Sequence, residues 1–292
     1  MSSLYLPFHP NPARPRFQLP VGAVDVHCHV FGPAKRFPFS DQRKYTPCDA
    51  DKETLFRLRQ HLGLTRNVIV QATCHGTDNR ALLDALQAGG DTTRGVVSLD
   101  SGVTDAELLV MHKAGVRGVR FNFVRRLVDD TPRSTFIDIA DRIRPLGWHV
   151  VVYFEAADFD GLRDFLLELN MPVVIDHMGR PDIEKGIESP EFQAFMAFME
   201  THSQIWTKVS CPERLSISGP PDYRDVVPFS RTLVQRFSDR VLWGTDWPHP
   251  NMRSHMPDEG DLVDLIPEIA PTASLQRALL IDNPMRLYWD EA

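Results

Sequence analysis

Eight short apolar runs, separated by segments with helical periodicity, constrain the fold more than any other feature of this sequence. Most of the runs are almost continuously apolar and rich in β-branched residues, which is typical of strands buried on both faces of a parallel sheet. They cover residues 23–29, 67–73, 94–99, 116–123, 148–154, 172–177, 205–210 and 240–246. The helical segments include 54–62, 79–88, 105–114, 136–146, 159–169, 191–201 and 226–237.

This alternation of strands and helices predicts a closed (β/α)8 barrel, with an open, doubly wound parallel sheet as the alternative topology. The length of 292 residues suits one barrel with long loops, because such barrels typically run to ~250 residues. We therefore predict a single domain over residues 1–292, in which residues 1–21 form an extended N-terminal arm.

Composition and charge exclude several classes of partner. The formal net charge is −7 and no run is dense in lysine or arginine, which argues against nucleic acid as a partner. The N-terminus lacks the apolar core of a secretory signal, and no stretch approaches the ~20 apolar residues needed to span a membrane. We expect a cytoplasmic protein without a membrane partner, and nothing in the sequence sets an oligomeric state. The four cysteines show no CxxC spacing, so we expect free thiols.

Histidine and aspartate side chains gather where the apolar runs end. His27 and His29 end the first run, His177 the sixth and Asp246 the eighth. The carboxyl ends of barrel strands meet at one face, where active sites are built, so these residues are expected to share a site. An HxH pair with a late aspartate resembles the amidohydrolase superfamily. The structural alternative is that His27 and His29 are only hydrogen-bonded core residues.

Such a set also suits Zn²⁺, since three imidazoles and a carboxylate are common zinc ligands. The binuclear members of that superfamily, however, carry a lysine on strand four and a histidine on strand five. Here strand four offers Arg120 and Asn122, and strand five offers Tyr153 and Glu155. We predict no metal and no other cofactor, with a single divalent ion at the three histidines and Asp246 as the alternative.

Arginines follow several of the same strands. Arg120 lies within the fourth run, and Arg126, Arg180 and Arg214 follow strand ends, whereas Arg125 is expected at the surface. A guanidinium is a poor neighbour for a dication but binds a carboxylate with two parallel hydrogen bonds. Several arginines around one barrel mouth in an acidic protein therefore predict a small ligand with more than one carboxylate.

Seven longer motifs make the resemblance more specific. They are VDVHCHVFGP, NVIVQATCHGTDNRAL, GVRGVRFNFVRRLVD, VVYFEA, DHMGRPD, KVSCPERLS and VLWGTDWPHPN. Together they resemble the 2-pyrone-4,6-dicarboxylate lactonase family, a metal-independent branch of the amidohydrolases, from about residue 22 to residue 289. The resemblance implies reversible hydrolysis of a small dicarboxylated pyrone to 4-oxalomesaconate, in the breakdown of lignin-derived aromatics through protocatechuate.

The same resemblance implies a role for each site residue. Asp246 corresponds to the general base that activates water, and His27, His29 and His177 to the group that polarises the lactone carbonyl. The residues that correspond to the substrate-binding shell are Tyr45, Thr73, Arg120, Arg126, Tyr153, Arg180 and Arg214. Thr73 stands where relatives are expected to have serine, and residues 218–223 form a loop that looks short for the family.

Three other functions compete with this interpretation. A different lactonase of the same branch would keep the HxH pair and Asp246 but change the arginines. A metal-dependent decarboxylase or hydratase would copurify with a metal that its activity requires. The non-enzymatic alternative is a barrel that only binds aromatic acids. Turnover of the lactone, followed as ultraviolet loss of the pyrone ring, separates all of these.

Overall fold

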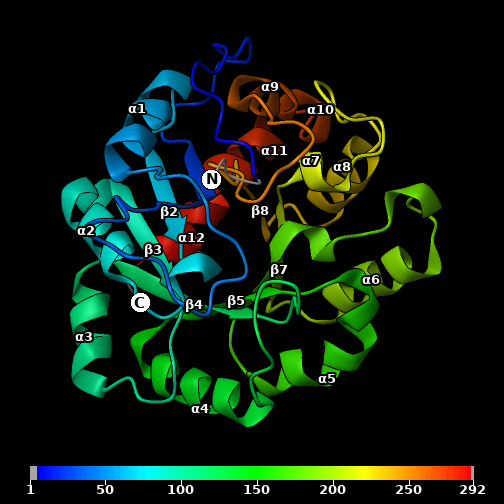
Figure 1. Ribbon diagram of the computed structural model, residues 1–292. Helices are drawn as coiled ribbons and strands as arrows, with labels where there is room; N and C mark the ends of the chain where they lie inside the picture. The colour runs from blue at the N-terminus through cyan, green and yellow to red at the C-terminus, as the bar shows by residue number, and fades with distance from the viewer. Residues whose placement is uncertain (1–4, 291–292) are drawn as a thin grey trace.

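The computed structural model describes residues 5–290 and shows eight parallel strands that pair in chain order, β1 to β8. Every strand predicted from the sequence is present, and the closed barrel is confirmed (Figure 1). The strands are β1 (Val24–Cys28), β2 (Arg66–Val70), β3 (Thr93–Val97), β4 (Val116–Asn122), β5 (His149–Tyr153), β6 (Val173–Ile175), β7 (Ile205–Val209) and β8 (Val241–Trp243).

Helices follow the strands and form a ring around them in Figure 1. The α-helices are α1 (Lys52–Leu62), α2 (Arg80–Gly89), α3 (Asp105–Lys113), α4 (Arg133–Ile143), α5 (Phe159–Glu168), α6 (Pro190–Thr201), α7 (Pro212–Leu215), α8 (Val227–Arg236), α9 (Glu259–Asp264), α10 (Ile266–Ile269), α11 (Ala273–Arg277) and α12 (Asn283–Tyr288). Short 3-10 turns are η1 (Thr73–His75), η2 (Gly90–Thr92), η3 (Arg144–Leu146), η4 (Ala156–Asp158), η5 (Asp176–Gly179) and η6 (Ile183–Lys185), and Ala278–Asp282 is a π-helical turn.

Local sequence signals explain where these helices begin and end. Asp51 accepts a hydrogen bond from the Thr54 backbone N–H at 2.8 Å and caps the start of α1. Gly63 ends the same helix in a left-handed conformation, which glycine adopts without steric cost. At α3, Thr104 and Glu107 form a reciprocal capping box.

The buried side chains form two clusters on opposite faces of the strands. A smaller cluster contains alternate strand residues such as Val68, Val70 and Val151 and fills the barrel. The larger cluster packs the other face of the strands against the helices, as where Phe121 meets Phe136 with ring centroids 4.4 Å apart. Burial on both faces accounts for the continuous apolar runs in the sequence.

The barrel closes where the chain beyond β8 meets β1. The Asp246 N–H donates to the His27 carbonyl, and the His29 N–H donates to the Trp247 carbonyl, both at 2.7 Å. Gly244 permits this approach, because a Cβ at that position would lie 2.6 Å from the His27 nitrogen. The closing seam therefore brings the predicted base together with His27 of β1 and with His29, which directly follows β1.

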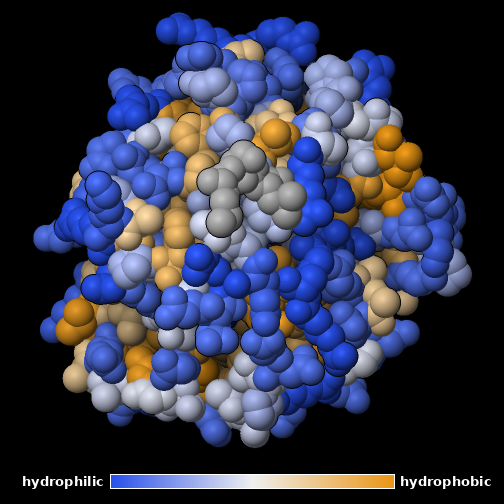
Figure 2. Space-filling view, viewed as in Figure 1, coloured by the Kyte–Doolittle hydropathy of each residue, from blue (hydrophilic) through white to orange (hydrophobic). Residues whose placement is uncertain are grey.

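The N-terminal arm runs against loops and helices of the C-terminal part of the chain. The Ala13 N–H donates to the Asp258 carboxylate at 2.9 Å, and Arg16 pairs with Asp264 at 2.7 Å. Residues 5–21 contain no helix or strand, and residues 1–4 of the predicted arm lie outside the described residues. The face shown in Figure 2 is mostly hydrophilic, with small apolar patches. Within residues 5–290, no helix is both long and apolar enough to cross a membrane.

Candidate active site

A cavity at the carboxyl ends of the strands collects the residues that the sequence singled out, apart from His27 and Arg180. His27 lies directly behind it, and Arg180 contacts Tyr153 at its edge. The charged groups that line the cavity are three guanidinium groups and one carboxylate. Its lining residues are His29, Tyr45, Ala72, Thr73, Arg120, Arg126, Leu127, Tyr153, His177, Arg214, Asp246, Pro250 and Asn251.

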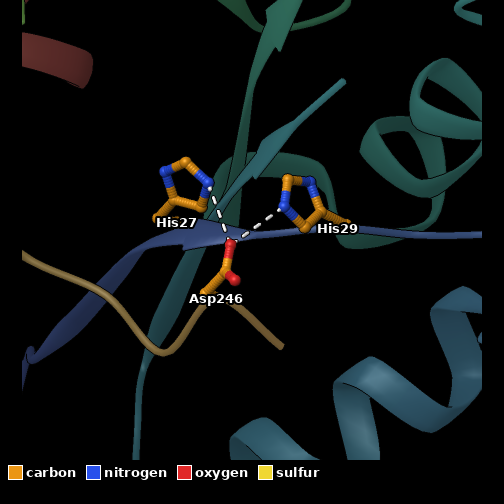
Figure 3. Close-up of side chains that lie close together, drawn as sticks. All are labelled: His27, His29 and Asp246. Atoms are coloured by element: carbon orange, nitrogen blue, oxygen red, sulfur yellow. Dashed lines mark hydrogen bonds and ion pairs between the residues drawn. The ribbon is translucent and has the colours of Figure 1, made fainter. Parts of the chain in front are cut away.

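Asp246 contacts His27 and His29 through one carboxylate oxygen (Figure 3). The Nε2 atoms of His27 and His29 lie 3.4 Å and 3.2 Å from Asp246 Oδ1. His29 Nδ1 lies 2.7 Å from the Val70 carbonyl oxygen, which only accepts hydrogen bonds. Both nitrogens of His29 therefore face acceptor oxygens.

Arg214 holds the other oxygen of the Asp246 carboxylate. Its Nε and one terminal nitrogen both lie 3.2 Å from Asp246 Oδ2. Burial alone raises the pKa of Asp246, but Arg214 and the hydrogen bond from His29 outweigh burial and hold that pKa well below its ordinary value. Asp246 is thus ionised at neutral pH, as a general base requires.

The remaining donors of Arg214 are also engaged within the protein. They bind Asn251 Oδ1 at 3.1 Å and the Pro250 carbonyl at 2.7 Å. The Arg214 guanidinium therefore orients Asp246 and the loop after β8, in addition to lining the cavity.

His177 is the third imidazole of the site. Its Nδ1 lies 2.8 Å from Ser210 Oγ, and its Nε2 lies 3.6 Å from the Cys211 sulfur. Burial holds the pKa of His177 well below its ordinary value, so the ring is neutral. Its ring centroid lies 4.8 Å from that of His27 and 5.1 Å from that of Tyr153.

A buried charge network lies beneath the imidazoles. Arg120 pairs with Asp176 Oδ2 at 2.8 Å, and Lys208 pairs with Asp176 Oδ1 at 3.0 Å. Burial raises the pKa of Asp176, but Lys208, His27 and Arg120 together lower it well below the ordinary range. Burial, and then the charge of Lys208, lowers the pKa of His27 to about 3, so His27 is neutral as well.

The outer rim of the cavity is built around Glu155, which binds two arginines. Arg180 donates to Glu155 Oε2 at 2.7 Å and to the Tyr153 hydroxyl at 3.1 Å. Arg126 donates to Glu155 Oε1 at 3.2 Å, and its side chain is 48% exposed. Arg126 can therefore turn toward a ligand at a small cost. Opposite this rim, the Tyr45 hydroxyl bonds the Thr73 side chain.

The structure corrects the expected positions of His177 and Asp246 as strand residues. β6 ends at Ile175 and β8 ends at Trp243, so both side chains lie in the turns that follow. His177, Cys211 and Asp246 have φ angles of 53°, 59° and 66°, in the left-handed region that L-residues rarely adopt. Strained backbone of this kind costs ~1–3 kcal/mol per residue and is concentrated at functional sites.

Three residues of the site were given no role from the sequence: Asp176, Lys208 and Glu155. Lys208 carried the clearest signal, because a lysine inside an apolar strand must find a buried partner, as Arg120 does. Asp176 lies within the predicted strand 172–177, next to His177, and Glu155 directly follows the predicted strand 148–154. Their function as arginine partners depends on packing between strands that are distant in sequence.

The site contains residue groups of the kind that bind metals. The ligand atoms of His27, His29 and Asp246 lie within 4.8 Å of one another, and His177 forms overlapping groups with Asp176 and with Cys211. Cationic side chains contact the same atoms: Lys208 lies 3.0 Å from His27 Nδ1, and Arg214 lies 3.2 Å from Asp246 Oδ2.

Comparison with known proteins places this geometry in context. Residues 24–289 match the amidohydrolase family. A 2-pyrone-4,6-dicarboxylate hydrolase of Comamonas testosteroni is 60% identical, with 98% of this chain and 96% of that protein aligned. A 4-sulfomuconolactone hydrolase of Hydrogenophaga intermedia is 38% identical, with 96% and 92% aligned. A crystal structure of a probable 2-pyrone-4,6-dicarboxylic acid hydrolase from Acinetobacter baumannii, with citric acid bound, superposes with a TM-score of 0.79 at 28% identity and covers 92% of this chain and 99% of its own.

Proposed function

This chain belongs to the amidohydrolase family, and we propose that it hydrolyses the ring ester of 2-pyrone-4,6-dicarboxylate to open-chain 4-oxalomesaconate. The observation that carries the proposal is the cavity, where three guanidinium groups surround one ionised aspartate. An anion with several carboxylates matches this charge, and the Acinetobacter baumannii structure contains citric acid, a tricarboxylic acid. We place the reaction in the breakdown of lignin-derived aromatics, and we treat the chain as one domain.

Asp246 is the proposed general base. It takes a proton from a water molecule while the water oxygen attacks the ester carbonyl carbon. The tetrahedral intermediate collapses with cleavage of the ring carbon–oxygen bond, and the proton returns to the leaving enol oxygen. A pyrone ester is activated, because its leaving oxygen is an enolate, so one positioned base and charge stabilisation at the carbonyl are sufficient.

The three imidazoles are proposed to stabilise the negative charge that develops on the carbonyl oxygen. Neutral His27 and His177 contribute oriented N–H groups, and His29 lies beside them in the cavity wall. Because these rings are buried and fixed before the reaction, they need no reorganisation as the charge forms.

The arginines and hydroxyl groups are proposed to hold the two carboxylates of the substrate. Arg126 is the most adaptable of them, because its side chain is half exposed and the carboxylate that it binds, Glu155, is itself partly exposed. Arg120 keeps donor atoms beyond those that bind Asp176, and it lies over the Tyr153 ring with 4.9 Å to the centroid. The complete proposed shell is Tyr45, Thr73, Arg120, Arg126, Tyr153, Arg180 and Arg214.

We also propose that the reaction needs no metal ion. A dication at His27, His29 and Asp246 would share their immediate surroundings with Lys208 and Arg214, whose positive charges oppose it at low local dielectric. Lys208 donates to His27 Nδ1, which places the hydrogen of the neutral ring on the nitrogen that a metal would need. Lys208 and Arg214 supply positive charge at the place where other family members use a metal ion.

The test is turnover of 2-pyrone-4,6-dicarboxylate by the purified chain, followed as loss of the pyrone absorbance. Asp246→Asn keeps the shape of the side chain and removes the base, so kcat should fall ~10²–10⁴-fold while the substrate still binds. No turnover of this lactone, together with turnover of a sulfonated muconolactone, would reassign the substrate. Near-normal kcat in Asp246→Asn would mean that another group activates the water.

A further inference from the structure

Lys208 is a fully buried side chain that takes no part in the catalytic steps proposed above. It lies near the carboxyl end of β7, and none of its side chain is exposed. Its ammonium group lies 3.0 Å from Asp176 Oδ1 and 3.0 Å from His27 Nδ1. Lys208 does not line the cavity, so any effect on the substrate must act through the residues that it touches.

The contact with His27 determines where that ring carries its hydrogen. Two groups approach His27 Nδ1: the Lys208 ammonium, which forms a hydrogen bond, and Asp176 Oδ1, which lies 3.3 Å away. An ammonium group has only donors, so Nδ1 accepts and a neutral His27 carries its hydrogen on Nε2. Asp176 alone would have the opposite effect, because a carboxylate accepts and would favour hydrogen on Nδ1.

His27 Nε2 is the ring atom nearest the proposed base, Asp246. It is buried and makes no hydrogen bond within residues 5–290, although Asp246 Oδ1 lies 3.4 Å away. A buried N–H without a partner costs ~1–3 kcal/mol, so a site that keeps one in a fixed position has a donor ready for a ligand oxygen.

We propose that Lys208 is a positioning residue that fixes His27 in the tautomer with hydrogen on Nε2 and so supplies a donor to the lactone carbonyl oxygen. The destination of that donor rests on the proposed function, whereas the tautomer itself does not. In the other tautomer, a lone pair on Nε2 would face the developing oxyanion and repel it.

Nitrogen NMR of histidine-labelled protein without substrate tests the tautomer directly. The wild-type protein should show His27 with its proton on Nε2 and a hydrogen-bonded, unprotonated Nδ1. In Lys208→Met the proton should move to Nδ1, toward Asp176. A wild-type spectrum with the proton on Nδ1 would overturn the proposal even if every variant failed to fold, and it would leave the proposed hydrolysis untouched.

A rescue variant separates positioning from general packing. In Lys208→Met/Asp176→Asn, the amide oxygen can still accept from Arg120 while the amide nitrogen donates to His27 Nδ1 in place of the lysine. The proton should then return to Nε2. A Lys208 side chain that acts only through packing would give no rescue. In that case the double variant has simply lost both charged partners of His27, Lys208 and Asp176.

Kinetics provide the second readout. Lys208→Met should lose on the order of 10²-fold in kcat, the typical cost of one oxyanion donor, with little change in KM. The double variant should recover part of this loss. Lys185→Met is the matched control, since Lys185 pairs with Glu191 at the surface and should leave both parameters unchanged. Unchanged kcat in Lys208→Met, or equal losses in the single and double variants, would contradict the proposal.

Discussion

Arg214→Met should move the acid limb of the pH profile of kcat/KM to higher pH. The guanidinium contacts Asp246 Oδ2 through two nitrogens at 3.2 Å, and both side chains are at least 87% buried, with exposed fractions of 13% and 5%. Methionine keeps much of the aliphatic packing and removes the charge. The variant therefore isolates the effect of Arg214 on the base.

The size of the shift follows from the strength of the contact. A hydrogen bond between charged groups is worth ~1.5–3 kcal/mol, and one pKa unit corresponds to ~1.4 kcal/mol. Arg214 stabilises the ionised form of Asp246 and lowers its pKa. Removing it should raise that pKa by ~1–2 units, and because the base works only when ionised, activity should be lost at correspondingly higher pH.

The assay is kcat/KM for the pyrone across the acid range, which reports ionisations of the free enzyme. Arg126→Met is the control, since Arg126 contacts Glu155 and not the base. The Arg126→Met variant should have a lower kcat/KM at every pH, and the acid limb of its pH profile should stay at the wild-type position. An acid limb at the wild-type position in Arg214→Met would refute the assignment of Arg214 as the partner that lowers the pKa of Asp246.

Three further predictions concern the ligand and the cofactor. Treatment with a chelator should leave activity intact, and elemental analysis showing one zinc per chain whose removal abolishes turnover would contradict this. The apparent equilibrium constant should rise with pH, because hydrolysis creates a carboxyl group that ionises; a constant independent of pH would argue against a lactone–acid couple. Arg126→Met and Arg120→Met should each lose roughly tenfold to a hundredfold in kcat/KM on the dicarboxylate. The loss should be smaller on a pyrone with one carboxylate, and equal losses on both substrates would make these arginines structural.

The sequence predicted the strands and helices well because each is encoded locally. Strands such as Val116–Asn122 are continuous apolar runs, and α1 begins at an aspartate cap that can be read from a few residues. The ends of β6 and β8 were placed too late, because the one or two residues between the last apolar strand residue and His177 or Asp246 were read as part of the strand. Their left-handed backbone depends on tertiary packing and has no glycine to mark it.

The cavity was predicted as a set of residues but not as a set of contacts. Arg120 and Arg214 were expected to hold substrate, and the structure shows each already paired with an aspartate, Asp176 or Asp246. Lys208 received no role because an isolated lysine in a strand suggests no partner until the strands are placed beside one another. Long-range pairing of this kind is a property of the closed barrel and not of any short motif.

The seam between β1 and the segment after β8 also has a consequence for biosynthesis. His29 and Asp246 are separated by 217 positions along the chain, so the ribosome makes the histidine early and the aspartate late. A nascent chain or proteolytic fragment that stops before β8 lacks the last strand of the barrel and also Asp246, the proposed base. We therefore expect two separately expressed fragments divided before β8 to be inactive alone and to regain activity only on reassembly.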